Sequence, residues 1–325
     1  MALDPRLAAL RFFGRGRADA PYEQLPPHVA RAMFAAEVAT AGPLFLGRGP
    51  TMVAVRDVYA ASLSLNLRLY HPRRSHHSQR AALHSRLPLI VFFHGGGWVV
   101  GSRETHDSLA RQLAHASGAA VLSVDYRLAP EHAFPAAIDD AFLATKWATE
   151  HADELDIDPS RIAVAGDSAG GNLAACVALR ARDEGGLHLA AQCLIYPATN
   201  TDFTTRSYTD FATGYGLTRA GMQWYWRMYA PSEDQRRDPY AAPALARSLA
   251  GLPPATVVTA EYDVLRDEGD AYAEALYRAK NDVAHRRVSG VTHGYIMMTR
   301  LLRSARLSID FIGERMRHAF EHVQR

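Results

Sequence analysis

The sequence predicts an α/β protein in which a mostly parallel sheet of eight strands is covered by helices on both faces. Apolar, β-leaning runs alternate with helical patterns along the later part of the chain, which is typical of β-α-β units. One run, at residues 87–93, is apolar throughout, as expected of a strand buried on both faces. At residues 161–180 an apolar run, a sharp glycine-containing turn and a helix-forming segment follow one another directly.

The composition is compatible with one large core. The chain has 325 residues, of which 48% are hydrophobic, and α/β folds of this size often form a single domain. The net charge is +2 with both signs interspersed, so no nucleic-acid partner is expected. Cys176 and Cys193 are expected to be small buried side chains rather than a disulfide.

Two features of the sequence bear on location. The first residues, Met1 to Arg6, lack the basic start and the apolar stretch of a secretory signal. No apolar run approaches the roughly 20 residues that a membrane helix needs. We therefore expect a cytoplasmic protein without a membrane partner.

The order of the predicted elements separates a core from an additional segment. Residues 1–50 are expected to form two short helices joined by proline-rich breaks. Residues 199–232 interrupt the later alternation, so the core would comprise residues 51–198 and 233–325. Its strands are expected at residues 51–59, 63–70, 87–93, 119–124, 162–165, 192–196, 256–260 and 284–288.

The segment Gly166–Gly170 carries the strongest functional signal. It has the pattern G-x-S-x-G between a strand and a helix, where a nucleophile elbow places a serine hydroxyl at the top of a sheet. The backbone of such a serine is strained, and the strand and helix crowd beside it, so the flanking glycines cannot carry bulk. The alternative is a glycine-rich turn with a chance serine. In this context the pattern predicts that Ser168 is a nucleophile.

A second glycine-rich segment, His-Gly-Gly-Gly-Trp at residues 94–98, follows the buried strand. Its backbone N–H groups lack side-chain cover, and such donors can stabilise the oxyanion of a tetrahedral intermediate. This pattern is typical of lipases and esterases. We expect the oxyanion hole to consist of the N–H groups of Gly96, Gly97 and Ala169. A phosphate-binding loop is the alternative, but neither of the usual glycine patterns follows the strand.

The serine needs a histidine as base and a carboxylate that orients the histidine. In α/β-hydrolases the carboxylate follows the serine in the chain, and the histidine follows the carboxylate. Asp263 comes just after the strand at 256–260, and His293 lies on the loop after the strand at 284–288, so these two complete the predicted triad. Glu261 is an alternative acid or a supporting hydrogen-bond partner, and Asp267 fits a helix cap better. The histidines that fit the base less well are His94, His188, His285, His318 and His322.

Together these residues resemble the hormone-sensitive-lipase-like esterases, bacterial family IV, of the subgroup with the Gly-Asp-Ser-Ala-Gly elbow. The matching segments, in the family's order and spacing, are residues 94–98, 125–137, 166–172, 196–197, 263–269 and 293–295. The chain departs from the family pattern at Ala133, Val264 and Tyr295, none of which removes a reacting group. The resemblance implies the α/β-hydrolase fold, with a helical cap formed by residues 1–50 and 199–232.

The resemblance also implies hydrolysis of small-molecule esters with short to medium acyl chains, without a metal or organic cofactor. Aromatic and methionine side chains of the cap would line an apolar pocket. The candidate substrate-binding residues are Trp98, Asp167, Tyr196 and Trp224. The resemblance further implies that Arg127 pairs with Glu131 beneath the site, and it makes a homodimer a candidate assembly.

Three alternatives stay open. The same triad could deacetylate, or cleave an amide of, a specific small molecule, because the acyl-enzyme step is common to these reactions. A non-catalytic ligand receptor is a second alternative, although related plant hormone receptors lack the base that His293 supplies here. The third is a metal site in the polar loop at 71–86, which lacks acidic or cysteine ligands and is expected to be a solvated connection. Its histidines are His71, His76, His77 and His84.

Overall fold

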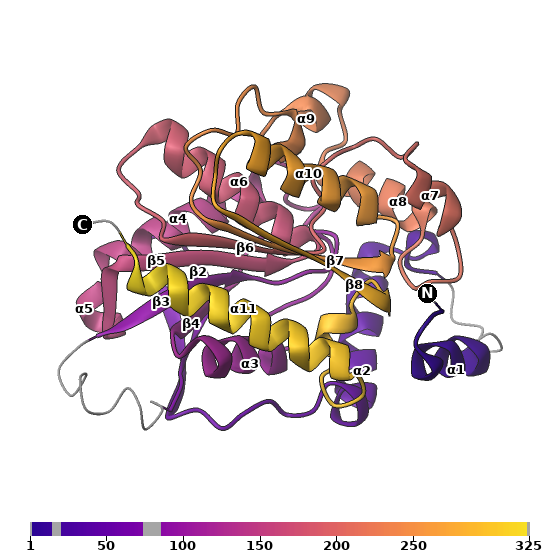
Figure 1. Ribbon diagram of the computed structural model, residues 1–325, viewed down its shortest axis with the longest axis horizontal. Helices are drawn as coiled ribbons and strands as arrows, with labels where there is room; N and C mark the ends of the chain where they lie inside the picture. The colour runs from indigo at the N-terminus through magenta and orange to yellow at the C-terminus, as the bar shows by residue number, and fades with distance from the viewer. Residues whose placement is uncertain (1, 15–20, 74–85, 324–325) are drawn as a thin grey trace.

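A computed structural model describes residues 2–14, 21–73 and 86–323. Its centre is one eight-stranded sheet with the strand order β1-β2-β4-β3-β5-β6-β7-β8 (Figure 1). Only the pairs β1–β2 and β2–β4 are antiparallel, which confirms the predicted mostly parallel sheet. The strands are β1 (Ala54–Ala60), β2 (Leu65–His71), β3 (Leu87–Phe93), β4 (Ala120–Asp125), β5 (Ile157–Asp167), β6 (Ala191–Ile195), β7 (Ala255–Tyr262) and β8 (Val283–Thr292).

Helices cover both faces of this sheet, as Figure 1 shows. One face is covered by α3 (Asp107–Ser117) and α11 (Arg303–Glu321), and the other by α4 (Ala136–Glu150), α6 (Ala169–Glu184) and α10 (Arg266–Arg278). The short α5 (Ala152–Leu155) precedes β5, and two 3-10 turns are η2 (Pro243–Leu245) and η3 (Tyr295–Met297). In the described part of the chain, every helix is too short or too polar to cross a bilayer.

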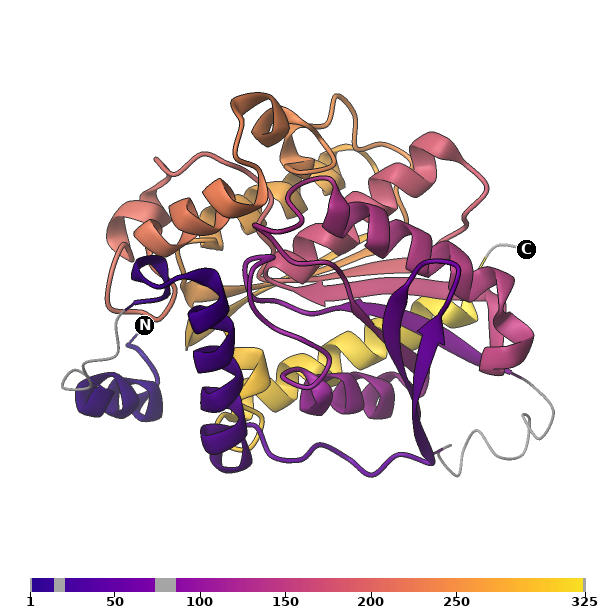
Figure 2. The ribbon, with the colours of Figure 1, turned by 180° about the vertical axis from the view of Figure 1, so that it is seen from behind.

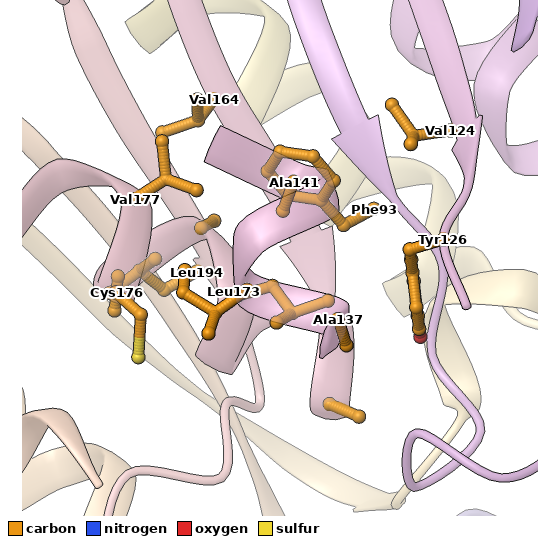
Figure 3. Packing of buried hydrophobic residues seen from close by; sticks show 14 of the residues in the cluster. Phe93, Val124, Tyr126, Ala137, Ala141, Val164, Leu173, Cys176, Val177 and Leu194 are labelled. Carbon is orange, nitrogen blue, oxygen red and sulfur yellow. The ribbon is translucent and has the colours of Figure 1, made fainter. Parts of the chain in front are cut away.

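The alternation of side chains along β3 supplies both hydrophobic layers. Leu89, Val91 and Phe93 belong to one buried cluster, whereas Ile90 and Phe92 belong to the other. A strand covered on both faces needs apolar residues at every position, which explains the unbroken apolar run. Figure 3 shows the first layer, where residues of β3, β5 and β6 pack against α4 and α6: Phe93, Val164, Leu194, Ala137, Ala141, Leu173 and Val177. Cys176 and Cys193 are free and buried, one in each layer.

Several elements are longer than expected, and β8 continues to Thr292 instead of ending at residue 288. β5 begins at Ile157 instead of residue 162, because Ile157 pairs with Leu87 beyond a register shift in β3. The polar stretch between the two paired parts hides this extension in the sequence. Near the N-terminus, α2 (Pro27–Phe45) is one long helix rather than a short one, and Pro43 lies inside its last turn, although proline has no N–H to donate to the carbonyl of residue 39.

Helical segments from two distant parts of the chain meet at the ends of the parallel strands, as seen from behind in Figure 2. They are η1 (Tyr22–Gln24) and α2 from the N-terminal part, and α7 (Arg206–Asp210) and α8 (Arg219–Tyr229) after β6; α9 (Glu233–Arg237) follows α8 and lies apart from α2, above α10 in Figure 1. η1 contacts α8, and Thr218 Oγ1 donates a hydrogen bond to Glu23 Oε1 at 3.1 Å. The first helix, α1 (Pro5–Gly14), lies elsewhere: Asp4 N donates to Gly290 O and Arg6 Nη1 to Leu301 O.

The expected Arg127–Glu131 pair is wrong. Arg127 Nη2 is 2.7 Å from Asp140 Oδ1, and Glu131 Oε2 is 2.5 Å from Arg31 Nη2 of α2. Arg31 also donates to the carbonyl oxygens of Val99 and Ala129, each at 2.7 Å. The partner of Glu131 is thus one hundred residues away in sequence, and only the docking of α2 brings it there.

Candidate active site

Ser168 stands at the junction of β5 and α6 with a strained backbone. Its φ of 58° and ψ of −118° lie outside the regions that a side-chain-bearing residue normally adopts. The flanking glycines make this turn feasible: a Cβ at Gly166 would overlap the carbonyl of Gly170, and one at Gly170 would overlap the carbonyl of Phe93. The backbone N–H of Ser168 donates to Ile195 O at 2.8 Å, which fixes the turn to β6. The serine side chain is therefore held at the end of the sheet.

The structure brings Ser168, His293 and Asp263 together from three segments of the chain. His293 Nε2 is 2.9 Å from Ser168 Oγ, and His293 Nδ1 is 2.6 Å from Asp263 Oδ2. Asp263 is 1% exposed and also accepts a hydrogen bond from Leu265 N at 3.0 Å. A carboxylate at Nδ1 favours the tautomer with its proton on that nitrogen, which leaves Nε2 free to accept the serine proton.

The alternative acids lie outside this arrangement. Glu261 Oε2 accepts a hydrogen bond from Gly290 N at 2.7 Å. Asp267 is in the first turn of α10 but provides no cap; its carboxylate accepts from Ser207 N at 2.7 Å and pairs with Arg266. Both therefore support the backbone near the site.

The other histidines have separate surroundings. His285 Nε2 is 2.8 Å from Asp270, and the rings of His318 and His322 contact each other near the end of α11. His188 lines a different pocket, which also includes His318. His94 is fully buried and stacks on Tyr126, and its Nδ1 lies 2.8 Å from Gly95 O. Burial, helped by a neighbouring imidazole, lowers the pKa of His94 to about 3, so this ring is neutral.

The glycine loop after β3 presents its backbone to the serine. Gly96, Gly97 and Ala169 all line the pocket that contains Ser168, and in the described structure none of their N–H groups has an acceptor within the protein. Gly97 has a φ of +59°, and a Cβ there would overlap the ring of Tyr225. This position therefore requires glycine on two counts. Unused N–H groups beside a nucleophile can hold an oxyanion.

Asp167 binds the backbone of the glycine loop. It is 3% exposed, its Oδ1 accepts from Gly95 N at 3.0 Å, and His106 Nε2 lies 3.5 Å away. Burial alone would raise the pKa of Asp167, but the imidazoles of His106 and His293 outweigh it, and the net shift is downward. No sequence motif singled out His106, which reaches this place from the segment before α3.

A second buried carboxyl, Glu268, lies on α10 near Asp263. Its Oε1 accepts hydrogen bonds from Thr199 N at 2.7 Å and Asn200 N at 3.3 Å. Burial raises the pKa of Glu268 to about 8, and the charge of Asp263 adds to the shift. Glu268 is thus largely protonated at neutral pH.

Ser168 and His293 line a pocket of about 440 Å³. Its lining comes from residues 21–37, the glycine loop, residues 167–169, residues 216–225 and the loop from His293 to Met297, together with His106 and Ala198. Of the candidate substrate-binding residues, Trp98 and Asp167 line it. Tyr196 and Trp224 do not. Tyr196 packs under the ring of His293, with the ring centroids 4.4 Å apart.

Trp224 is buried but does not line the pocket, and its neighbour Tyr225 lines it instead. On an amphipathic helix covered on more than one side, sequence cannot tell which of two adjacent aromatic residues faces the ligand. The sequence reasoning also missed the pocket residues of the N-terminal segment, whose position depends on α2 docking. They are Pro21, Tyr22, Glu23, Met33, Phe34 and Glu37.

The residues in the described ranges form no group of three or more His, Cys, Asp or Glu side chains that could hold a metal ion. His71 Nε2 lies 3.1 Å from Leu155 O at the end of β2. His76, His77 and His84 lie outside the described residues.

Comparison with known proteins gives a consistent result. A family model described as the α/β-hydrolase fold matches residues 90–297. Carboxylic ester hydrolase LipN of Mycobacterium tuberculosis is 47% identical over 220 residues, which cover 66% of this chain and 58% of LipN. The chain thus matches less than two thirds of that relative's length.

Two further proteins are similar over nearly their whole length. Ethyl acetate hydrolase of Pseudomonas putida is 35% identical over 317 residues, or 94% of this chain and 95% of the relative. The structure of a hyperthermophilic esterase from the archaeon Pyrobaculum calidifontis has a TM-score of 0.89 and 38% identity, covering 98% of this chain and 99% of that one.

Proposed function

The chain belongs to the α/β-hydrolase fold family, and we propose that it is a serine carboxylesterase acting on esters with short to medium acyl chains. The observation that carries this proposal is the contiguous hydrogen-bonded series Ser168–His293–Asp263 opening into a pocket. Relatives named as esterases support ester hydrolysis. Within the family, we propose membership of the hormone-sensitive-lipase-like group with the Gly-Asp-Ser-Ala-Gly elbow, on the motifs given above.

In the proposed mechanism, Ser168 Oγ attacks the ester carbonyl carbon while His293 Nε2 takes its proton. Asp263 holds the imidazole and stabilises the imidazolium that forms. The oxyanion accepts hydrogen bonds from the N–H groups of Gly96, Gly97 and Ala169. The C–O bond to the alcohol then breaks, and the alcohol leaves with the proton from His293. A water molecule attacks the acyl-enzyme by the same route, which releases the acid and restores the serine.

The pocket's size and lining support the preference for shorter chains. Its volume of about 440 Å³ is near the lower end of the range for small-molecule sites. Methionine and aromatic side chains, which suit an acyl chain, provide much of its surface. The relative named ethyl acetate hydrolase points to a small ester as well.

Hydrolysis of p-nitrophenyl esters from acetate to palmitate tests the proposal, with the wild type and Ser168→Ala side by side. We expect activity that peaks at short or medium chains and falls by about 10⁴-fold or more in the variant. Ser160→Ala, which changes an exposed serine at the start of β5, serves as the control. A folded wild type without turnover on any chain length would overturn the esterase proposal and favour a narrow deacetylase or a binding protein.

We also propose a homodimer as the assembly, on the family resemblance. The sheet offers two edge strands, β1 and β8, for such pairing. Light scattering coupled to size exclusion should give twice the mass of one chain, and the mass of a single chain would contradict a dimer.

A further inference from the structure

The part of the pocket formed by the cap segments carries two carboxylates, Glu23 of η1 and Glu37 of α2. Among the described residues that line the pocket there is no lysine or arginine. The remaining acid, Asp167, already has His106 and the N–H of Gly95 as partners. The pocket therefore has a negative field that originates in the cap.

In the described structure, both carboxylates have hydroxyl groups rather than cations as partners. Glu23 Oε1 accepts a hydrogen bond from Thr218 Oγ1, and Glu37 Oε2 accepts one from Tyr22 Oη at 2.5 Å. Neither forms an ion pair with any cation in the described ranges, although the chain has 36 lysines and arginines against 34 acids. Hydroxyl partners orient a carboxylate but do not neutralise it.

Stabilisation of a helix end could explain the position of Glu23 but not that of Glu37. Glu23 lies at the first turn of α8, where a Cβ on Gly221 would be 3.6 Å from its Oε2, so it also suits the positive end of that helix. Glu37, however, is on the side of α2 and lies at no helix end. That both acids border the same cavity as the serine nucleophile does not follow from capping.

Aromatic rings stand beside these carboxylates. Tyr22 and Phe34 make an edge contact with ring centroids 6.3 Å apart, and Tyr225 lies over the glycine loop. Burial raises the pKa of Tyr225, and the charges of Glu23 and Glu37 raise it further, so both acids act on this ring. Aromatic faces attract alkylammonium groups. Tyr225 is buried, whereas Glu37 is exposed to solvent.

We propose that this enzyme prefers esters that carry an alkylammonium group. The cation lies between the carboxylates of Glu23 and Glu37 and the rings of Tyr22 and Tyr225, while the ester carbonyl reaches Ser168. The proposal rests on the esterase function proposed above and assigns a substrate class to the same pocket.

Matched pairs of esters that differ only in charge test this preference. One pair carries the charge on the alcohol, butyrylcholine against 3,3-dimethylbutyl butyrate. The other carries it on the acyl group, p-nitrophenyl 4-(trimethylammonio)butyrate against p-nitrophenyl 5,5-dimethylhexanoate. For at least one pair we expect the wild-type kcat/KM of the cationic ester to exceed that of the neutral ester by about tenfold, falling as salt is added.

Glu23→Gln and Glu37→Gln keep the shape and the hydrogen-bond acceptor but remove the charge. Each should lower the cationic-to-neutral ratio of kcat/KM by about threefold to fivefold, mainly through KM, and Glu37→Asp should retain part of the preference. Glu321→Gln removes an equal charge at the far end of α11 and should leave the ratio unchanged (Figure 1).

The measurements distinguish a failure of the proposed cationic preference from a failure of the proposed esterase function. If both pairs give ratios near one in the wild type, or if the glutamine variants leave a high ratio intact, the cationic preference is overturned while esterase activity stands. If the wild type hydrolyses neither member of either pair nor any p-nitrophenyl ester, the esterase function itself is overturned.

Discussion

The ring of Tyr225 lies directly over Gly97, so closely that a Cβ on the glycine would overlap it. The two residues come from different parts of the fold: Gly97 from the loop after β3, and Tyr225 from α8. The contact places α8 on the backbone that we propose as the oxyanion hole. The position of α8 and that of the proposed oxyanion donors are thus coupled through one residue pair.

Gly97→Ala should damage this region in two ways. A side chain at a φ of +59° costs about 1 kcal/mol or more, and the methyl must also displace Tyr225. We expect kcat to fall by about 10²-fold in p-nitrophenyl acetate hydrolysis, because one oxyanion donor moves. Gly118→Ala is the matched control: its φ is +68°, but a Cβ there meets nothing within 4 Å. It should lose stability and keep kcat; equal kcat values for both variants would contradict the role of the contact.

Asp263→Asn should lower kcat by about 10⁴-fold with a smaller effect on KM. The amide can still accept from Leu265 N, but it no longer favours the proton on Nδ1 of His293. Steady-state kinetics on p-nitrophenyl butyrate measure the effect. Asp270 forms a second aspartate–histidine pair, with His285, away from the pocket. Asp270→Asn should therefore affect the Tm and spare kcat, and a reversed pattern would remove Asp263 from the proposed triad.

Glu268→Gln should change how stability depends on pH. The pKa of Glu268 is raised to about 8 in the folded protein, so between about 4.5 and 8 the folded state holds a proton that the unfolded state has released. The resulting stabilisation is complete below the unfolded pKa and is lost as pH rises through the folded pKa. Glutamine imitates the protonated form at every pH.

Thermal unfolding at several pH values from about 5 to about 9 measures this difference. The Tm of the wild type should fall relative to that of Glu268→Gln as pH rises to about 8, and the gap should then stay constant. Glu274→Gln, which changes an exposed residue of the same helix, should track the wild type. Parallel curves for wild type and Glu268→Gln would show that Glu268 is ionised in the fold.

Local sequence patterns predicted the core strands and the serine turn, because the constraints that produce them act between residues close together in the chain. The continuous apolar run of β3 corresponds to a strand with a layer on each face, and the glycines around Ser168 correspond to places where a Cβ would overlap backbone. The extension of β5 back to Ile157 was not predictable, because it depends on pairing with Leu87 across the sheet.

The residues in and around the pocket could be predicted from the sequence only in part. Asp263 and His293 could be chosen from the sequence because each follows a recognisable strand, and chain order then left few alternatives. Arg31, which binds Glu131, and His106, which contacts Asp167, had no such signal. Their partners are set by the docking of α2 and α3, which depends on side chains far apart in the chain.

The sequence by itself determined the sheet, the strained serine turn, the glycine loop and the order of the proposed catalytic residues, because steric limits on the backbone and strand periodicity act over a few residues. Only the tertiary structure decided what surrounds the substrate. It turned Tyr225 rather than Trp224 to the pocket and brought Glu23 and Glu37 beside it. Those choices follow from how two distant helical segments pack against each other, and that packing minimises exposed apolar area over the whole molecule rather than along any one segment.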